Sequence, residues 1–181
     1  AGAKMIGYVH TSYTARPLAD VTRDIELWRA YYPLDGFFVD EMSNAGTGAQ
    51  LLYYSSIYQY VKALDARYTV IGNPGTDAAE SYMSLPATDV LVNFEWTAAA
   101  YKTYKPAAYM ATYGPARQAH LVHDADPRAA PLDIVDTARS RGAGWVYVTD
   151  DRGASNPWDR LPVYWDDLVR RVCKVNTGRA C

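Results

Sequence analysis

A short apolar run that ends in polar or acidic residues, followed by a segment with helical spacing, recurs along the chain and most constrains its fold. The apolar runs that we expect to be strands are 5–10, 36–41, 68–74, 89–95, 119–124 and 145–150. Three-to-four spacing predicts helices over 20–31, 50–64, 132–141 and 162–173. Near-continuous apolar strands that alternate with helices are typical of a parallel sheet covered on both faces.

The ends of these strands distinguish between the two common parallel folds. An open doubly wound sheet usually has a glycine-rich phosphate loop after its first strand, whereas this chain has His10-Thr11-Ser12-Tyr13 there. Polar groups gathered at the carboxyl ends of many strands are typical of the mouth of a TIM barrel. The sequence therefore predicts an α/β fold of the TIM (β/α)8 type. The polar strand ends are Asp40-Glu41, Asn73, Glu95, His123-Asp124 and Asp150-Asp151.

The length predicts that this barrel is incomplete. A full barrel takes about 250 residues, whereas the chain has 181, which is enough for one domain. Six strand–helix units and a weak strand candidate at 107–112 leave two of eight units absent. We expect a single barrel-type catalytic domain over 1–181, with further chain or a partner covering the edge formed by Met5–His10, because an unpaired strand edge is an aggregation template.

Charge and composition argue against several classes of partner. The net charge is −2, whereas nucleic acids and anionic membranes favour a basic surface. No apolar stretch approaches the roughly 18–20 residues of a membrane span. The 16 Tyr and 5 Trp, against 3 Phe, suit a wet cleft as well as a dry core.

Cys173 and Cys181 fit either a small disulfide loop of a secreted protein or two unpaired thiols, and they are too few for a zinc site.

Asp40, Glu41 and Glu95 are the candidate catalytic residues. Adjacent carboxylates after an apolar strand are costly unless they are solvated, paired or used in chemistry. On local evidence a solvated loop explains Asp40-Glu41 better than catalysis does, and a surface loop explains Glu95 about as well. Neighbouring strand ends of a barrel open into one bowl, however, so we expect the three carboxylates to converge. A carboxylate pair is what glycosidic cleavage needs, because one group protonates the leaving oxygen and the other stabilises or attacks the sugar cation.

Other chemistries have weaker support in the sequence. The G-x-S-x-G motif of a nucleophilic serine is absent, and both cysteines lie in the tail. His10, His123 and Asp124 lack a metal-binding spacing such as H-E-x-x-H, so we predict no metal and no other cofactor. Polar and aromatic side chains near strand ends are candidates for substrate binding, although each also fits ordinary packing or backbone contacts. These candidates are Tyr8, His10, Tyr13, Asn73, Trp96, His123, Asp124, Tyr147 and Asp150.

Several blocks of the sequence resemble the spherulin-4 family. They are Gly7–Tyr13, Arg16–Leu18, Trp28–Pro33, Asp35–Asn44, Gly72–Gly75 and Phe94-Glu95. The family includes fungal enzymes of glycoside hydrolase family 135, which are endo-acting α-1,4-N-acetylgalactosaminidases that cut galactosaminogalactan. The resemblance implies a (β/α)8 barrel with an adjacent Asp-Glu pair and a later Glu in its cleft, which fall on Asp40, Glu41 and Glu95. Family members have two further strands before the Gly7–Tyr13 block, so the resemblance implies that this chain lacks the first two βα units.

These inferences together predict a secreted or cell-wall-associated glycoside hydrolase. We expect carboxylate acid/base chemistry with retention of configuration, in which Asp40 is nucleophile or stabiliser, Glu95 is general acid, and Glu41 tunes or exchanges these roles. Adjacent strand residues point to opposite faces, so Asp40 and Glu41 share the cleft only if the strand ends between them. The substrate's acetamido group is an alternative nucleophile. A non-catalytic polysaccharide-binding or cell-wall protein is the main alternative function, and a metal-dependent deacetylase is a third.

Overall fold

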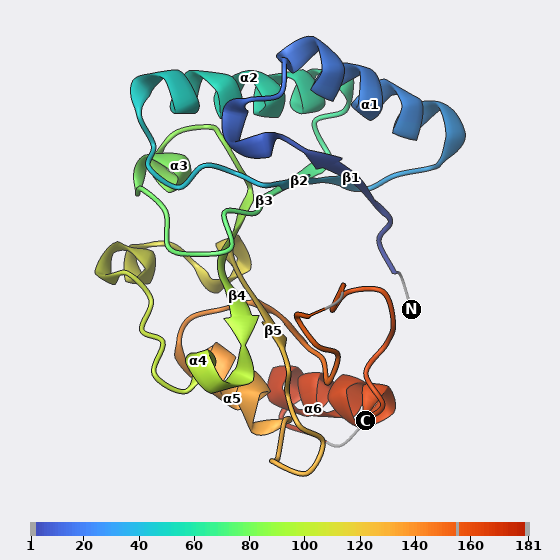
Figure 1. Cartoon of the computed structure of the whole chain (residues 1–181), viewed down its shortest axis with the longest axis vertical. Coiled ribbons are helices and arrows are strands. Elements are labelled where there is room, and N and C mark those ends of the chain that lie inside the picture. Colours follow the sequence, from blue (N-terminus) through green and yellow to red (C-terminus); the bar gives the residue numbers. More distant parts are fainter. Residues whose placement is uncertain (1–2, 155, 180–181) are drawn as a thin grey trace. The chain divides into compact units, whose positions relative to one another are not determined.

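The computed structural model describes residues 3–154 and 156–179 and contains a six-stranded sheet with the strand order β1-β2-β3-β4-β5-β6 (Figure 1). The registered pairs, β1–β2, β2–β3, β3–β4 and β5–β6, are parallel. The predicted parallel α/β sheet is therefore confirmed, although the order begins at β1 and ends at β6 and does not show a closed barrel. The strands are β1 (Ile6–His10), β2 (Gly36–Asp40), β3 (Thr69–Gly72), β4 (Val90–Thr97), β5 (Gln118–His123) and β6 (Trp145–Val148).

Helices follow the strands much as the spacing predicts. The four predicted helices correspond to α1 (Leu18–Tyr31), α2 (Gly48–Leu64), α5 (Asp133–Ser140) and α6 (Trp165–Thr177). A capping box between Thr47 and Gln50 starts α2, and Gly178 ends α6 with a left-handed φ of 72°. The remaining short helices were not predicted, and they are α3 (Ser81–Ser84), α4 (Ala98–Tyr101), η1 (Ser12–Thr14), η2 (Ala108–Thr112) and η3 (Pro115–Arg117).

The weak strand candidate at 107–112 is wrong, because this segment forms the 3-10 helix η2. The segment contains alanines, which are compatible with a helix. Met110 is only 1% exposed, and its burial holds the turn in place. Gln118 Nε2 donates hydrogen bonds to the Met110 carbonyl at 2.9 Å and to the Tyr113 carbonyl at 3.0 Å. These carbonyls therefore have a side-chain partner, so the segment does not need to pair with a neighbouring strand to satisfy them.

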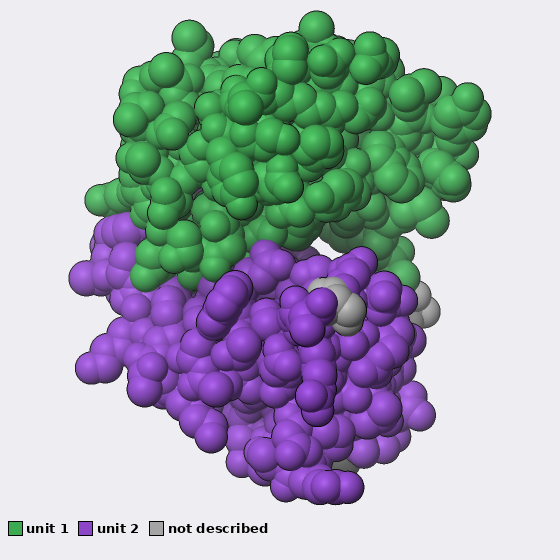
Figure 2. Space-filling view, in the orientation of Figure 1, with its two compact units in different colours: residues 1–93 green, residues 94–181 purple. Residues whose placement is uncertain are grey.

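The chain divides into two compact units, Ala1–Asn93 and Phe94–Cys181, and Figure 2 colours them separately. In the first unit, α1 and α2 cover one face of the strands (Figure 1), and Ile25, Ile57 and Phe37 are buried there. In the second unit, Val122 and Val148 on the strands pack with Val135 and Leu168 on α5 and α6. Each unit thus has a core of its own between strands and helices.

Successive residues of a strand point to opposite faces, so the residues of β1 and β2 that do not pack under the helices can take part in a site. In β1 and β2, Val9 and Val39 are buried under the helices, whereas Tyr8 and Asp40 lie on the other face.

None of the helices in the described part of the chain has the length and apolar character that crossing a membrane demands. Cys173 takes part in a disulfide, and Cys181, its predicted partner, lies outside the described residues.

Candidate functional site

Asp40 lies at the carboxyl end of β2 and is held by side chains from both neighbouring strands. The Tyr8 hydroxyl, from β1, donates to Asp40 Oδ2 at 2.7 Å, and Asn73 Nδ2, directly after β3, donates to Oδ1 at 2.7 Å. Asn73 is itself fixed, because its backbone N–H donates to the Val39 carbonyl and its Oδ1 accepts from the Gly75 N–H. Two donors on one carboxyl group fix its plane, so Asp40 is oriented before any ligand arrives.

Glu41 shares this face with His10 because β2 ends between Asp40 and Glu41. Glu41 has a left-handed φ of 51°, which breaks the alternation of the strand at the point that the sequence analysis required. Its Oε2 lies 3.4 Å from His10 Nδ1, and His10 is the register partner of Asp40 across the β1–β2 ladder. We call Tyr8, His10, Asp40, Glu41 and Asn73 the Asp40 cluster.

Thr11 fastens the loop beneath the Asp40 cluster, and sequence reasoning missed it. Its side chain is fully buried, and its Oγ1 lies 2.8 Å from the Glu41 carbonyl and 3.1 Å from the Asp40 carbonyl, to which it donates. The Tyr54 hydroxyl, 3.1 Å from this Oγ1, also accepts from the Ser43 N–H. The only signal in the sequence that could have identified it is a threonine directly after an apolar strand.

Glu95 lies near the end of β4 in the second unit, where Trp158 contacts it. Trp158 Nε1 donates to Glu95 Oε1 at 3.0 Å, although the two residues are 63 positions apart in the chain. Sequence reasoning missed Trp158, and the only local signal was a tryptophan between polar residues in the loop 156–160. We call Glu95, Trp96, His123, Tyr147 and Trp158 the Glu95 cluster.

Aromatic rings join the members of the Glu95 cluster in a row. The His123 ring lies 5.9 Å from the Trp96 ring and 5.8 Å from the Trp158 ring, and Trp158 lies 6.0 Å from Tyr147. His123 is buried, and its Nδ1 lies 2.6 Å from Asp124 Oδ2. Edge-to-face and tilted rings at these separations are mutually stabilising. Trp96, by contrast, is 61% exposed and can offer its face to a ligand.

Asp124 is a hydrogen-bond acceptor that orients His123. Burial disfavours its charged form, but the Gly153 N–H and His123 together outweigh this effect and hold the pKa of Asp124 below its ordinary value. Gly153 must remain glycine for close approach, because a Cβ there would lie 2.6 Å from His123 Cε1. Asp124 thus lies beside the Glu95 cluster as a support for its histidine.

Asp150 is held by contacts with the loop that follows β6, and its predicted role in substrate binding stays a prediction. Burial disfavours its ionisation, but the Val163 N–H and Arg160 outweigh this effect, so the pKa of Asp150 is lowered. Its Oδ1 accepts from the Val163 N–H at 3.0 Å, and Arg160 Nη1 lies 3.3 Å away. Tyr147 is fastened to the same loop, because its hydroxyl donates to the Arg160 carbonyl at 3.2 Å. Burial raises the pKa of this hydroxyl.

The predicted site residues therefore gather in two groups. Asp40, Glu41, Tyr8, His10 and Asn73 form one group in the first unit, and Tyr13 lies beside them in the loop, 63% exposed. Glu95, Trp96, His123 and Tyr147 form the second group, with Asp124 and Asp150 in adjacent supporting contacts. The convergence of Glu95 with Asp40 and Glu41 stays a prediction.

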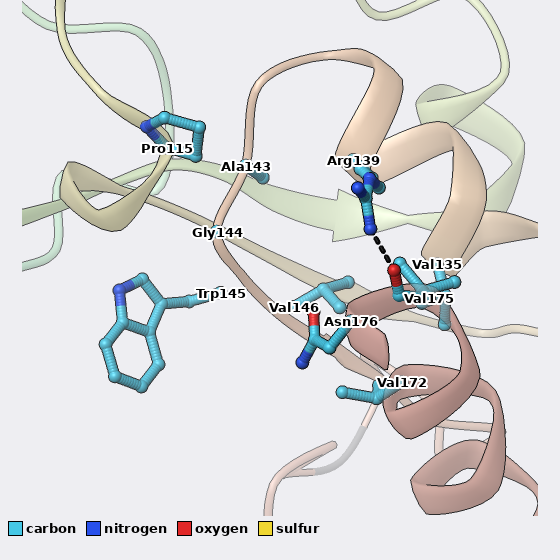
Figure 3. A pocket seen from close by; sticks show the side chains of 10 residues that line it. All are labelled: Pro115, Val135, Arg139, Ala143, Gly144, Trp145, Val146, Val172, Val175 and Asn176. Carbon is cyan, nitrogen blue, oxygen red and sulfur yellow. Dashed lines mark hydrogen bonds between the residues drawn. The ribbon is translucent and has the colours of Figure 1, made fainter. Parts of the chain in front are cut away.

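Two pockets of the second unit differ in their relation to these groups. An open polar pocket of about 600 Å³ is lined by Asp124, Asp150 and Arg160, beside the carboxyl ends of β5 and β6. A pocket of about 520 Å³ lies at the amino end of β6, where Trp145, Val146 and Val172 line it (Figure 3). This second pocket contains none of the predicted site residues. Within residues 3–154 and 156–179, no group of three or more His, Cys, Asp and Glu side chains has an arrangement that could hold a metal ion.

Comparison with known proteins places this geometry in a family. The model of spherulation-specific family 4, Spherulin4, matches residues 1–172. The chain belongs to this family. It is 29% identical to spherulin-4 of Physarum polycephalum over 182 residues, which is 97% of this chain and 54% of that protein. The chain therefore spans about half the length of this spherulin-4.

A solved structure shares the fold of this spherulin-4 family member. The crystal structure of Aspergillus clavatus Sph3, determined in complex with GalNAc, superimposes with a TM-score of 0.81. The match covers 93% of this chain and 72% of Sph3, and the sequences are 22% identical. At that identity the likeness shows the fold, and it extends the α/β assignment to nearly the whole chain.

Proposed function

We propose that this protein is a glycoside hydrolase that cleaves α-1,4-linked N-acetylgalactosamine in a polysaccharide resembling galactosaminogalactan. Membership of the spherulin-4 family and a fold shared with Sph3, which binds GalNAc in its crystal structure, support this substrate class. We infer internal cleavage of the chain, because the resemblance to endo-acting enzymes covers the blocks around Asp40 and Glu95. Such a polysaccharide lies outside the cell, so the proposal includes secretion.

The observation that carries the proposal is the fixed orientation of Asp40. Its two oxygens accept hydrogen bonds from Tyr8 and Asn73, each at 2.7 Å, at the carboxyl ends of adjacent parallel strands. Carboxyl strand ends are where barrel enzymes carry their catalytic groups. A loop aspartate that only caps a helix needs no such pair of side-chain donors.

The proposed reaction assigns a separate step to each carboxyl group. Glu95 as general acid protonates the glycosidic oxygen, the bond from that oxygen to the anomeric carbon breaks, and Asp40 attacks or stabilises the anomeric carbon. A water molecule then displaces Asp40 while Glu95 takes up the proton of the water, which regenerates both groups. Glu41 lies beside His10 and tunes the pair. In the alternative, the acetamido oxygen attacks and Asp40 orients it.

The stereochemical outcome depends on one distance. Retaining enzymes hold the two carboxyl groups about 5–5.5 Å apart and inverting enzymes about 6.5–9.5 Å apart. We propose retention, and a complex of the protein with an oligosaccharide is the measurement. Separations beyond about 10 Å for both Asp40–Glu95 and Glu41–Glu95 would contradict the paired mechanism.

The decisive experiment compares carboxylate variants in reducing-end release from galactosaminogalactan. Glu95→Gln and Asp40→Asn are close in shape to the natural residues and should retain the fold while lowering turnover by about 10²–10⁴-fold. Asp35→Asn is a matched control, because Asp35 lies at the other end of β2, where its Oδ2 accepts from the Met5 N–H at 2.8 Å. Turnover of Glu95→Gln close to that of the unchanged protein would remove Glu95 from the mechanism.

The same assay separates the alternative functions. A polysaccharide-binding protein, which the exposed rings of Trp96 and Tyr13 favour, would retain the polymer without new reducing ends. A metal-dependent deacetylase would release acetate and lose activity to a chelator. A hydrolase instead releases reducing ends in the presence of chelator.

A further inference from the structure

The loop after β6 carries a residue that acts on Glu95, although it is far from Glu95 in the sequence. Trp158 Nε1 lies 3.0 Å from Glu95 Oε1. The indole N–H is a donor only, so this contact has one direction, from the tryptophan to the carboxyl group. Glu95 is half-buried on β4, where one fixed donor restricts the side chain to few orientations.

The Trp158 ring is itself held from two other strands. His123 at the end of β5 packs edge-on against it at 5.8 Å and 79°, and Tyr147 on β6 packs at 6.0 Å and 55°. Both supports are in turn fixed, since His123 Nδ1 lies 2.6 Å from Asp124 Oδ2 and the Tyr147 hydroxyl donates to the Arg160 carbonyl. The donor that faces Glu95 is therefore placed by the packing of its ring against side chains of β5 and β6.

We propose that Trp158 is the positioning residue of Glu95. It sets the orientation of the Glu95 carboxyl group through the hydrogen bond from the indole N–H to Oε1. The inference rests on the proposed function for its catalytic consequence. Positioned acid groups act efficiently only within a narrow range of geometry, so loss of the donor should affect the reaction more than substrate binding.

The kinetic test uses a double-variant cycle. Trp158→Phe retains an aromatic ring between His123 and Tyr147 and removes the N–H, so kcat should fall about ten- to hundredfold with KM little changed. In the Glu95→Gln background the same change should have almost no further effect, because the two residues act as a unit. Trp145→Phe is the matched control, since Trp145 Nε1 donates to the Ala116 carbonyl at 2.8 Å, at the amino end of β6.

Indole N–H resonances give a readout that needs no activity. The Trp158 signal, assigned by its absence in Trp158→Phe, should move in Glu95→Ala, whereas the Trp145 signal should not. An unmoved Trp158 signal overturns the inference whether or not the protein cleaves polysaccharide. Multiplicative losses in the kinetic cycle, or a rise in KM alone, also overturn it. Absence of cleavage by the unchanged protein overturns the proposed function instead, while the resonance shift still decides the positioning of Glu95.

Discussion

At the scale of single residues, His120 shows how burial determines the chemistry of a side chain. It is fully buried on β5, where its Nδ1 lies 2.6 Å from the Tyr101 hydroxyl, and no hydrogen-bond partner of its Nε2 is present in the described structure. Arg141 lies over the Tyr101 ring at 4.4 Å and adds positive charge nearby. Burial, with a smaller effect of Arg141, lowers the pKa of His120 to about 4. His120 is therefore a neutral core residue at physiological pH.

This shift predicts a loss of stability in acid. The unfolded chain takes up a proton on His120 below its ordinary pKa of about 6.5, while the folded protein does so only near 4. The contribution is present in full above pH 6.5 and falls as the pH decreases toward 4. Between pH 7.5 and 5 the free energy of unfolding should fall by about 2 kcal/mol from this group.

The measurement is urea unfolding of the natural protein and His120→Gln at both pH values. The glutamine can still meet the Tyr101 hydroxyl but does not titrate, so the gap in stability between the two proteins should narrow at pH 5. The carboxylates titrate alike in both proteins and cancel in the comparison. A constant gap would contradict the assignment.

Among the structural elements, the loops that follow β1 and β2 are joined by hydrogen bonds next to the Asp40 cluster. Ser12, Tyr13 and Thr14 all have positive φ, at 46°, 54° and 78°, and Glu41 follows at 51°. Such conformations of non-glycine residues cost on the order of 1–3 kcal/mol each and persist only where surrounding contacts impose them. Thr11 supplies these contacts through the Asp40 and Glu41 carbonyls.

Thr11→Val tests whether the Thr11 hydroxyl holds the two loops together. The change retains the shape of the side chain and removes a hydroxyl that is buried against two carbonyls and the Tyr54 hydroxyl, so unfolding should become easier by about 1–3 kcal/mol. Turnover should fall as well, because Glu41 loses its fixed backbone. Thr22→Val is the matched control, since the Thr22 hydroxyl donates to the Ala19 carbonyl on α1 at 3.1 Å. Equal effects of the two changes on the free energy of unfolding would show that the Thr11 hydroxyl does not hold the two loops together.

At the scale of the whole molecule, the first strand is an edge of the described sheet. In a parallel ladder alternate residues direct their backbone groups to the same neighbour. The Met5 carbonyl accepts from the Asp35 N–H, and the Thr11 N–H donates to the Asp40 carbonyl, so odd-numbered residues of this segment face β2. The N–H groups of Ile6, Tyr8 and His10 therefore point away from β2. Side chains meet part of this edge, because Trp28 Nε1 donates to the Tyr8 carbonyl and Arg16 Nη1 donates to the His10 carbonyl. A strand edge without a neighbouring strand is nevertheless a template for pairing. That further chain or a partner covers Met5–His10 stays a prediction.

The prediction for the 181-residue chain is self-association through β1. Ile6→Pro removes an N–H on the open side and leaves the β1–β2 ladder intact, so it should shift the protein toward a 20.1 kDa monomer. Analytical ultracentrifugation over a range of concentrations measures this shift, and Ile6→Val, which retains the N–H, is the control. A chain that stays monomeric without any substitution would show that the edge is protected in another way.

Local pattern was sufficient to identify the strands and the main helices, because hydrophobic periodicity records which face of each element is buried. It was misleading at 107–112, where an apolar composition supports a short helix as readily as a strand, and only the reach of Gln118 to the Met110 carbonyl decides between them. Strand-end position likewise pointed to Asp40 and Glu95, because polar residues after apolar runs are uncommon without a reason. It said nothing of which side chains hold them.

Residue type and spacing along the chain were enough to predict the parallel sheet, the polar strand ends and the family. Tertiary structure decided the partners: Tyr8 reaches Asp40 across 32 positions, and Trp158 reaches Glu95 across 63. It also decided that Glu41 turns to the face of His10, through a left-handed φ that no residue preference would have predicted for glutamate. Contacts between distant positions and imposed backbone conformations exist only after the chain has folded, and so no local pattern encodes them.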